Sequence, residues 1–193
     1  MKNLETKKDI RRQVRSARAG LPEGKRIAYS ASIQHKLLEH PFYQQADEIY
    51  CYVSFGDEVI TAQILEESFR QGKKVAVPKI LTEEMKDCRK YMEFFYIHSM
   101  EELEEGYYGI LEPVTREKAV GRNVLVVMPG VAFDSSCHRI GYGGGFYDAY
   151  LRRHADYRTI ALAYSIQCLE QIPCMEHDIC PEIILTEKES YTC

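Results

Sequence analysis

The chain has 193 residues, of which 45% are hydrophobic and 28% charged, and its formal net charge is −4. That length suits one sizeable hydrophobic core, so we expect residues 1–193 to form a single domain. The apolar runs VLVVM and IALAY have five residues each, which is far too short to span a membrane. The charged stretch from Lys2 onward has no apolar signal core, so we expect a cytoplasmic protein that makes no membrane contact. We also expect a monomer.

The first half of the chain predicts helices and strands in alternation. Thr6 suits the N-cap of a helix over 7–19, with Asp9 at the capping-box position. A Gly-Leu-Pro sequence ends that helix, and a second helix is expected to run from Pro22 to about Glu39. Further expected elements are strands at 48–53, 73–80 and 91–98, and a helix over 62–71 that Thr61 caps.

The second half contains the clearest buried strand, NVLVVM at 123–128. A glycine-rich loop and a helix follow it, and further strands are expected at 159–164 and 182–186. Strands that alternate with helices predict an α/β fold with a largely parallel sheet covered on both faces. In such sheets, ligands bind outside the carboxyl ends of the strands.

Polar residues are concentrated at these strand ends. Asp57 and Glu58 follow the first strand, and Asp178 precedes the last one. From spacing alone, Asp57 and Glu58 either contact a ligand or belong to a solvated loop. Asp134, which follows the central strand, is expected to fix the conformation of its own loop.

The stretch RIGYGGGFYD, 139–148, places four glycines between an arginine and an aspartate. Backbone N–H groups in such a run can form a nest for an anion, and Arg139 adds a planar fork for phosphate oxygens. Asp148 offers a hard oxygen ligand for a magnesium ion that a nucleotide carries. The spacing matches neither the dinucleotide fingerprint nor the P-loop. A plain flexible turn is the alternative interpretation of the glycines.

The cysteines give no indication of a metal site. Their number is odd and no CxxC spacing occurs, so we expect neither a zinc site nor a disulfide framework. Cys137 and His138 are adjacent, and because neighbouring side chains seldom face each other, they are not expected to act as a nucleophile pair. The seven cysteines lie at positions 51, 88, 137, 168, 174, 180 and 193.

The segment MPGVAFDSSCHRIGYGGGFYDAYL, 128–151, resembles the signature of 5-formyltetrahydrofolate cyclo-ligases, also called methenyltetrahydrofolate synthetases. Weaker blocks that resemble the same family occur in the expected order: KKDIR, DEVIT, YGILEP at 108–113, and EHDICPEIILT. The resemblance implies a three-layer α/β/α fold with a mainly parallel central sheet, similar to ribose-5-phosphate isomerases and CoA transferases. It also implies ATP-dependent cyclisation of 5-formyltetrahydrofolate to 5,10-methenyltetrahydrofolate through a phosphorylated formyl group, with release of ADP and phosphate.

The resemblance assigns roles to individual residues of this chain. Those expected to contact ATP are Lys7, Lys8, Arg11, Arg139, Gly141, Gly143, Gly144, Gly145, Phe146 and Tyr147. Those expected to contact the folate are Val53, Glu58, Tyr142, Gly143, Gly145 and Phe146. Those expected to be catalytic are Glu58, Arg139 and Tyr147, and those expected to bind Mg²⁺ are Asp148 and Asp178. Glu58 either binds the donor edge of the pterin or orients the attacking nitrogen. Phe146 stands where many members have tyrosine, so no hydrogen bond is expected from that side chain.

The N-terminal segment is strongly basic. Residues 1–26 carry nine Lys and Arg against three acidic residues, whereas the rest of the chain carries 16 against 26. On a helix, four of these bases fall within about 80° of one another: Lys7, Arg11, Arg15 and Arg18. The resemblance assigns the first two to ATP. We expect the other two to be solvated.

Two alternatives to the cyclo-ligase interpretation remain. A basic arm on an acidic body is compatible with RNA binding, but residues 1–26 contain none of the aromatic side chains that RNA-binding modules use. We therefore expect no nucleic acid to bind. The second alternative is a paralogue of the same fold that binds folate or a nucleotide without cyclo-ligase activity.

Overall fold

The computed structural model describes residues 6–83, 89–106 and 109–193. Lys2, Cys88 and Tyr108, the last being the first residue of the YGILEP block, lie outside the described residues.

The N-terminal helix α1, Lys7–Ala19, begins where the sequence predicts. The backbone N–H of Asp9 donates to the Thr6 hydroxyl at 3.3 Å, and that hydroxyl donates to the Asp9 carboxylate at 2.6 Å. Thr6 therefore caps the helix, with Asp9 holding the capping hydroxyl in place. Helix α2, Glu23–Glu39, follows as predicted. A short helix α3, Pro41–Gln45, begins at the proline that ends α2, a position that proline favours.

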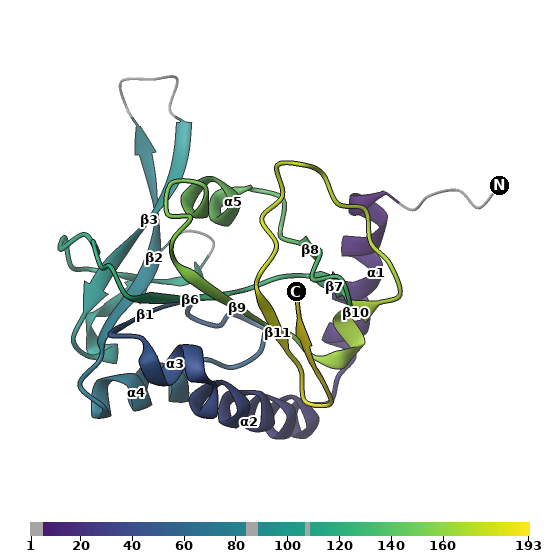
Figure 1. The fold of residues 1–193 in the computed structure, drawn as a ribbon, viewed down its shortest axis with the longest axis horizontal. Helices are drawn as coiled ribbons and strands as arrows, with labels where there is room; N and C mark the ends of the chain where they lie inside the picture. Colours follow the sequence, from purple (N-terminus) through teal and green to yellow (C-terminus); the bar gives the residue numbers. More distant parts are fainter. Residues whose placement is uncertain (1–5, 84–88, 107–108) are drawn as a thin grey trace.

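A seven-stranded sheet forms the centre of the fold, in the order β12-β11-β9-β6-β1-β2-β3 (Figure 1). The inner strands pair in parallel, and the edge strands β3 and β12 run antiparallel to their neighbours. Every residue of β6 is buried, as expected for a strand covered on both faces. The prediction of a mainly parallel sheet is confirmed. The strands are β1 Glu48–Cys51, β2 Lys74–Glu83, β3 Arg89–Ile97, β6 Val124–Met128, β9 Arg158–Leu162, β11 Ile183–Leu185 and β12 Ser190–Thr192.

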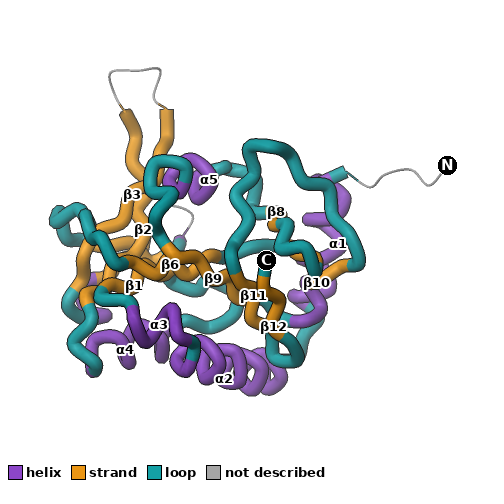
Figure 2. The backbone as a smooth tube through the Cα atoms, in the orientation of Figure 1, coloured by secondary structure: helices purple, strands orange, loops and turns teal. Residues whose placement is uncertain are grey.

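Helices cover both faces of the sheet, as Figures 1 and 2 show. Helices α2, α3 and α4 (Ala62–Arg70) pack on one face, and α5 (Phe146–Leu151) packs on the other. Buried side chains fill the two interfaces, including Ile33 and Ile64 on the first and Phe94 and Tyr150 on the second. The three-layer architecture is therefore confirmed. In the described ranges, no helix is both long and apolar enough to cross a membrane.

Thr61 is the N-cap residue of α4, as predicted, but its side chain makes no capping hydrogen bond. Its hydroxyl donates to the Tyr52 carbonyl at 2.8 Å and accepts from the Ser54 N–H at 3.0 Å. The hydroxyl is thus used to tie the loop after β1 to the start of α4. This tie fixes the two ends of the segment that carries Asp57 and Glu58.

Short strands that the sequence pattern does not predict position the glycine loop. Strands β7, Ala132–Asp134, and β8, Arg139–Ile140, form a hairpin. Helix α1 packs on this hairpin, and its buried Ile10 and Val14 share a cluster with hairpin residues. In Figure 1, α1 accordingly stands beside β7 and β8 at one end of the central sheet. Other elements are β10 Cys168–Leu169, which pairs with β7, β4 Leu103–Glu105, β5 Leu111–Pro113, and 3-10 helices over Met100–Glu102 and Ser165–Gln167.

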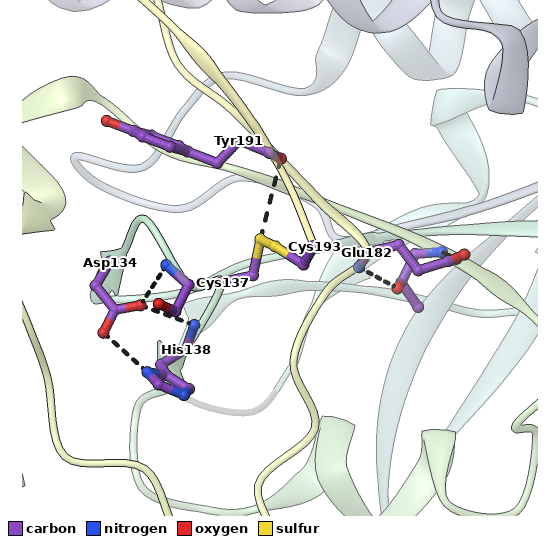
Figure 3. The surroundings of a disulfide bond; sticks show 8 residues. Asp134, Cys137, His138, Glu182, Tyr191 and Cys193 are labelled. Atoms are coloured by element: carbon purple, nitrogen blue, oxygen red, sulfur yellow. Dashed lines mark hydrogen bonds and ion pairs between the residues drawn. A yellow bond between two sulfur atoms is a disulfide. The ribbon is translucent and has the colours of Figure 1, made fainter.

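A disulfide joins Cys137, in the β7–β8 hairpin, to Cys193, which follows β12 (Figure 3). The two Cα atoms are 6.1 Å apart, and the cysteines are separated by 56 positions. The Asp134 carboxylate fixes the same hairpin, since it accepts hydrogen bonds from the N–H groups of Ser136 and His138. The loop-fixing role predicted for Asp134 is therefore confirmed. The disulfide was not expected, because an odd number of cysteines without short spacing does not indicate so distant a pair.

Substitution of Gly130, between β6 and β7, should be much more costly than substitution of Gly24 in α2. A Cβ at Gly130 would lie 2.3 Å from Cζ of the buried Phe133, whereas one at Gly24 has no atom within 4 Å. We expect Gly130→Ala to lower the free energy of unfolding by about 1–3 kcal/mol through overpacking. Gly24→Ala should leave it unchanged or raise it by up to about 1 kcal/mol. Urea unfolding followed by circular dichroism measures both. Equal stability of the two variants would contradict the packing of this turn.

Candidate active site

A cavity of about 850 Å³ opens between α1, the glycine loop, α5 and the edge strand β3. Its volume is in the range of small-molecule sites. Six Lys and Arg line it against two Asp, so the cavity favours an anionic ligand. The predicted ligands that it brings together are Lys7, Arg11, Arg139, Gly141, Gly143, Gly144, Gly145, Phe146, Asp148 and Asp178.

The glycine loop requires bare backbone where it passes under α1. Gly143 and Gly145 have positive φ angles of 109° and 66°, a region that residues with side chains disfavour. A Cβ at Gly143 would lie 3.7 Å from Cζ of Arg11, whose Nε donates to the Gly141 carbonyl at 2.7 Å. The loop is therefore more than a flexible turn, because its backbone is held in contact with a guanidinium group.

Arg139 anchors the loop from beneath. Its side chain is almost fully buried, and its terminal nitrogens donate to the Asp148 carboxylate at 2.9 Å and to the Pro129 carbonyl at 3.2 Å. Its Nε is buried and has no hydrogen-bond partner among the described residues. The Arg139 fork is thus already engaged by the protein on two of its nitrogens, and only part of it is available to a ligand.

The two predicted metal ligands lie close together on the cavity wall. Asp178 forms an ion pair with Lys7 and accepts from the Met175 N–H at 2.7 Å, both through Oδ2. Asp148 accepts from the N–H of Ile179, the neighbour of Asp178, at 2.9 Å, and from Arg139, both through Oδ1. Each carboxylate therefore keeps its other oxygen out of these bonds.

Two such carboxylates fit a magnesium ion that phosphate groups carry, because Mg²⁺ usually takes one or two carboxylates and completes its shell with phosphates and water. No cluster of three or more His, Cys, Asp or Glu suited to a metal occurs in the described ranges. The donor set therefore does not form a cage of protein ligands alone.

The two aromatic residues at the start of α5 lie on different sides of it. Phe146 lines the cavity. The Tyr147 hydroxyl is buried without a hydrogen-bond partner among the described residues, and burial raises the pKa of Tyr147 well above its ordinary value. The Arg139 guanidinium lies 6.0 Å from the centre of the Tyr147 ring. Tyr147 therefore supports Arg139 as a neutral, protonated side chain.

Two of the predicted folate contacts, Glu58 and Tyr142, meet at a second location, and Val53 is buried in the segment that follows β1. None of the three is among the residues that line the 850 Å³ cavity in the described part of the chain. Glu58 accepts hydrogen bonds from the Tyr142 hydroxyl and, at 2.9 Å, from the Phe55 N–H. Burial raises the pKa of Glu58 above its ordinary value, although both hydrogen bonds lower it. Half of the Phe55 surface and 46% of the Tyr142 surface remain exposed beside this carboxylate, so aromatic faces are available there.

Arg18 is not solvated, contrary to the prediction. Its side chain is buried and donates to Asp57 Oδ1 at 2.7 Å and to the Tyr142 hydroxyl at 3.0 Å. The helical spacing that groups Arg18 with Lys7 and Arg11 was the signal that could have indicated this. Arg15 is exposed, as expected. Lys8, predicted to bind ATP, lines a separate groove on α1 rather than the cavity.

Residues 3–187 match the model of the 5-formyltetrahydrofolate cyclo-ligase family. The chain belongs to this family. It is 30% identical over 194 residues to the 5-formyltetrahydrofolate cyclo-ligase of Mus musculus, with 94% of this chain and 93% of the relative covered. It is 28% identical to that of Haemophilus influenzae, with 92% and 95% covered. The family and the enzyme class that the signature predicted are therefore confirmed.

Solved structures agree with this assignment. The NMR structure of Aquifex aeolicus 5,10-methenyltetrahydrofolate synthetase superimposes with a TM-score of 0.82 and 28% identity, over 96% of this chain and 92% of that one. The Mycoplasma pneumoniae 5,10-methenyltetrahydrofolate synthetase has a TM-score of 0.74 at 19% identity, over 95% and 99% of the two chains, and shows the same fold.

The Lys7–Asp178 pair should make stability depend on pH. Burial alone would raise the pKa of Asp178, but the bonds from Lys7 and the Met175 N–H lower it below the ordinary value of 3.8. The stability contributed by the ionised form is therefore present above pH 3.8 and is lost as the pH falls through the lowered pKa. Asp178→Asn should cost about 1–2 kcal/mol at pH 7, and this cost should shrink towards acid pH. Urea unfolding at about pH 7, 4 and 3 measures it, because the cost should begin to shrink only below the ordinary value of 3.8.

Asp156→Asn is the matched control, because this exposed aspartate makes no side-chain hydrogen bond with a described residue. Its effect should be small at every pH. A cost of Asp178→Asn that stays constant with pH would contradict the charged pair.

Proposed function

We propose that the protein closes 5-formyltetrahydrofolate to 5,10-methenyltetrahydrofolate at the expense of ATP and releases ADP and phosphate. The observation that supports this most directly is the basic cavity, in which Lys7 and Arg11 lie over a glycine loop of bare backbone. The match of residues 3–187 to the family gives the reaction class.

The chemistry explains why ATP is required. The formyl group on N5 is an amide, and its oxygen is a poor leaving group. In the proposed reaction this oxygen takes the terminal phosphoryl group of ATP, and ADP leaves. Nitrogen N10 then attacks the activated carbon and loses its proton, and the carbon–oxygen bond breaks to release phosphate. The carbon ends bonded to both N5 and N10.

Phosphoryl transfer requires mainly positioning and charge neutralisation. Lys7 and Arg11 lie one helical turn apart on α1 and both line the cavity. We assign them to the phosphates of ATP, together with the backbone N–H groups of the loop from Gly141 to Gly145. Arg139 keeps Asp148 against this loop, so its proposed role is to shape the phosphate site as well as to contact it. Tyr147 supports Arg139 from the buried side.

Magnesium would be held by Asp148 and Asp178 together with the phosphates of the nucleotide. When bound, the ion would neutralise phosphate charge and orient the terminal phosphoryl group. Lys7 also contacts Asp178, so this lysine is placed to neutralise charge at the boundary between the carboxylates and the phosphates.

Glu58 is the residue that we assign to the folate, with Tyr142 and the half-exposed Phe55 beside it and Val53 in the segment after β1. A carboxylate there accepts a hydrogen bond either from the donor edge of the pterin or from the attacking N10. Both roles require the ionised form. Because burial raises the pKa of Glu58, activity should fall as the pH drops through that raised pKa and this group becomes protonated.

The test of the proposed function is direct. Purified protein is mixed with 5-formyltetrahydrofolate and magnesium-ATP, and the absorbance of the methenyl product is followed. We expect product formation that depends on ATP and stops when the nucleotide is omitted. Binding of both substrates without product would instead indicate the paralogue, and failure to bind either substrate would contradict the proposal.

The two bases assigned to ATP should differ sharply from a third on the same helix. Loss of a charge-assisted bond to phosphate costs about 1.5–3 kcal/mol, so Lys7→Ala and Arg11→Ala should each raise the KM for ATP by about ten- to a hundredfold. The exposed Arg15→Ala is the control and should leave it unchanged. Steady-state kinetics with each substrate varied in turn measures these values.

The same three variants separate this assignment from RNA binding. RNA retention on a filter would weaken with every base removed, Arg15 included, and would depend strongly on salt. That pattern, together with unaltered kinetics for ATP, would contradict the assignment.

A further inference from the structure

We propose that Arg18 is a positioning residue that fixes Tyr142 and Glu58 for the folate and couples them, through helix α1, to the residues that hold ATP. This inference rests on the proposed function. It concerns a side chain to which the family signature gives no role, and it follows from how that side chain is buried and bonded.

The Arg18 guanidinium is held between two segments that are far apart in sequence. Only 4% of its side-chain surface is exposed. One terminal nitrogen donates to Asp57 at 2.7 Å, and the other donates to the Tyr142 hydroxyl at 3.0 Å. Burial alone would lower the pKa of Arg18, but the bond to Asp57 raises it, so the group remains charged. A buried charge with two different partners brings α1, the loop after β1 and the glycine loop to one point.

The hydrogen bonds continue from Arg18 to the folate carboxylate. The Tyr142 hydroxyl accepts from Arg18 and donates to Glu58 Oε1, while the other oxygen of Glu58 accepts from the Phe55 N–H at 2.9 Å. An ion pair with Asp57 alone would satisfy the charge of Arg18. The additional bond to Tyr142 is what connects Arg18 to Glu58 and fixes the direction in which the tyrosine hydroxyl donates.

Helix α1 supplies the connection to ATP. Lys7, Arg11 and Arg18 fall within about 40° of one another around the helix and span about 16 Å along it. The first two line the nucleotide cavity, and the third contacts the folate side. Because a helix that packs through buried Ile10 and Val14 moves as one body, a shift of its phosphate end displaces Arg18 as well.

The charges around Glu58 determine in which direction the loss of each neighbour moves the pKa of Glu58. The groups that face Glu58 are Arg18 from α1, Tyr142 from the glycine loop, Asp57 from its own loop, Tyr52 from the segment after β1 and Tyr147 from α5. Arg18 and the Tyr142 hydroxyl lower the pKa of Glu58, whereas Asp57 raises it. Removal of Arg18 should therefore favour the protonated form of Glu58, and removal of Asp57 should favour the ionised form.

The test is the pH dependence of kcat/KM for 5-formyltetrahydrofolate in wild type, Arg18→Gln and Asp57→Asn. Both variants lose the same ion pair, so both should have a lower melting temperature. In Arg18→Gln the acid limb of the profile should move to higher pH by about one unit. In Asp57→Asn it should move to lower pH. Glu58→Gln should lack this limb, and Arg15→Gln should superimpose on wild type.

A structural role alone would give a different pattern. Arg18→Gln and Asp57→Asn would then lower the melting temperature and the active fraction without opposite movements of the limb, which would overturn the proposal. An acid limb that persists in Glu58→Gln would also overturn it, because the limb would then belong to another group.

Tyr142→Phe keeps the test available where Arg18→Gln does not fold. This variant preserves the Arg18–Asp57 pair and removes only the hydroxyl that links Arg18 to Glu58, so its limb should also move to higher pH. An unchanged limb in Tyr142→Phe contradicts the proposal. Absence of methenyl product with the wild-type protein is a separate outcome, since it contradicts the proposed function before any variant is compared.

Discussion

The docking of helix α1 onto the glycine loop is the interaction on which the whole candidate site depends. Arg11 donates to the Gly141 carbonyl, Lys7 pairs with Asp178, and Arg18 donates to Tyr142. Three cations of one helix thus hold the glycine loop and the segment that carries Asp178. Without α1, the glycine loop would lose its bonds from Arg11 and Arg18, and the cavity would lose two of the six bases that make it attractive to phosphate.

The opposite side of the loop is fixed by the β7–β8 hairpin. The Asp134 carboxylate accepts hydrogen bonds from backbone N–H groups of the hairpin. The disulfide of Cys137 joins the hairpin to the segment after β12, and Arg139 of β8 donates to Asp148. The glycines between the hairpin and α5 therefore have no side chains of their own, but the segment that contains them is fixed at both ends. Such a loop can present backbone N–H groups to an anion without a large cost in conformational entropy on binding.

The central part of the fold could be predicted from the sequence because its signals are local and strong. Continuous apolar runs such as VLVVM at 124–128 indicated buried parallel strands. Thr6, followed by a basic amphipathic stretch, indicated helix α1. The hairpin strands were not predictable in this way, since β8 has only two residues and carries no periodic pattern. The antiparallel direction of β3 and β12 depends on how the loops connect them to β2 and β11, and amino-acid composition does not show this.

The candidate site could be predicted residue by residue where the glycine motif is specific, and less well where partners come from distant segments. Helical spacing groups Arg18 with Lys7 and Arg11 on one side of α1, but it does not show which residues lie opposite, so Arg18 was wrongly expected in solvent. Thr61 stands at the predicted N-cap of α4, but its hydroxyl donates to the Tyr52 carbonyl and does not cap the helix. The Cys137–Cys193 bond joins residues with no shared local signal. In each case the partner is brought close only by the tertiary fold.

The most direct test of this account is amide hydrogen exchange measured by mass spectrometry, with and without magnesium and a non-hydrolysable ATP analogue. If α1 and the glycine loop form one phosphate-binding unit, the analogue should slow exchange in segments 7–19 and 141–146 together. Subsequent addition of 5-formyltetrahydrofolate should slow exchange in the loop that carries Glu58. Nucleotide binding that protects neither α1 nor the glycine loop, or protects one without the other, would contradict the account.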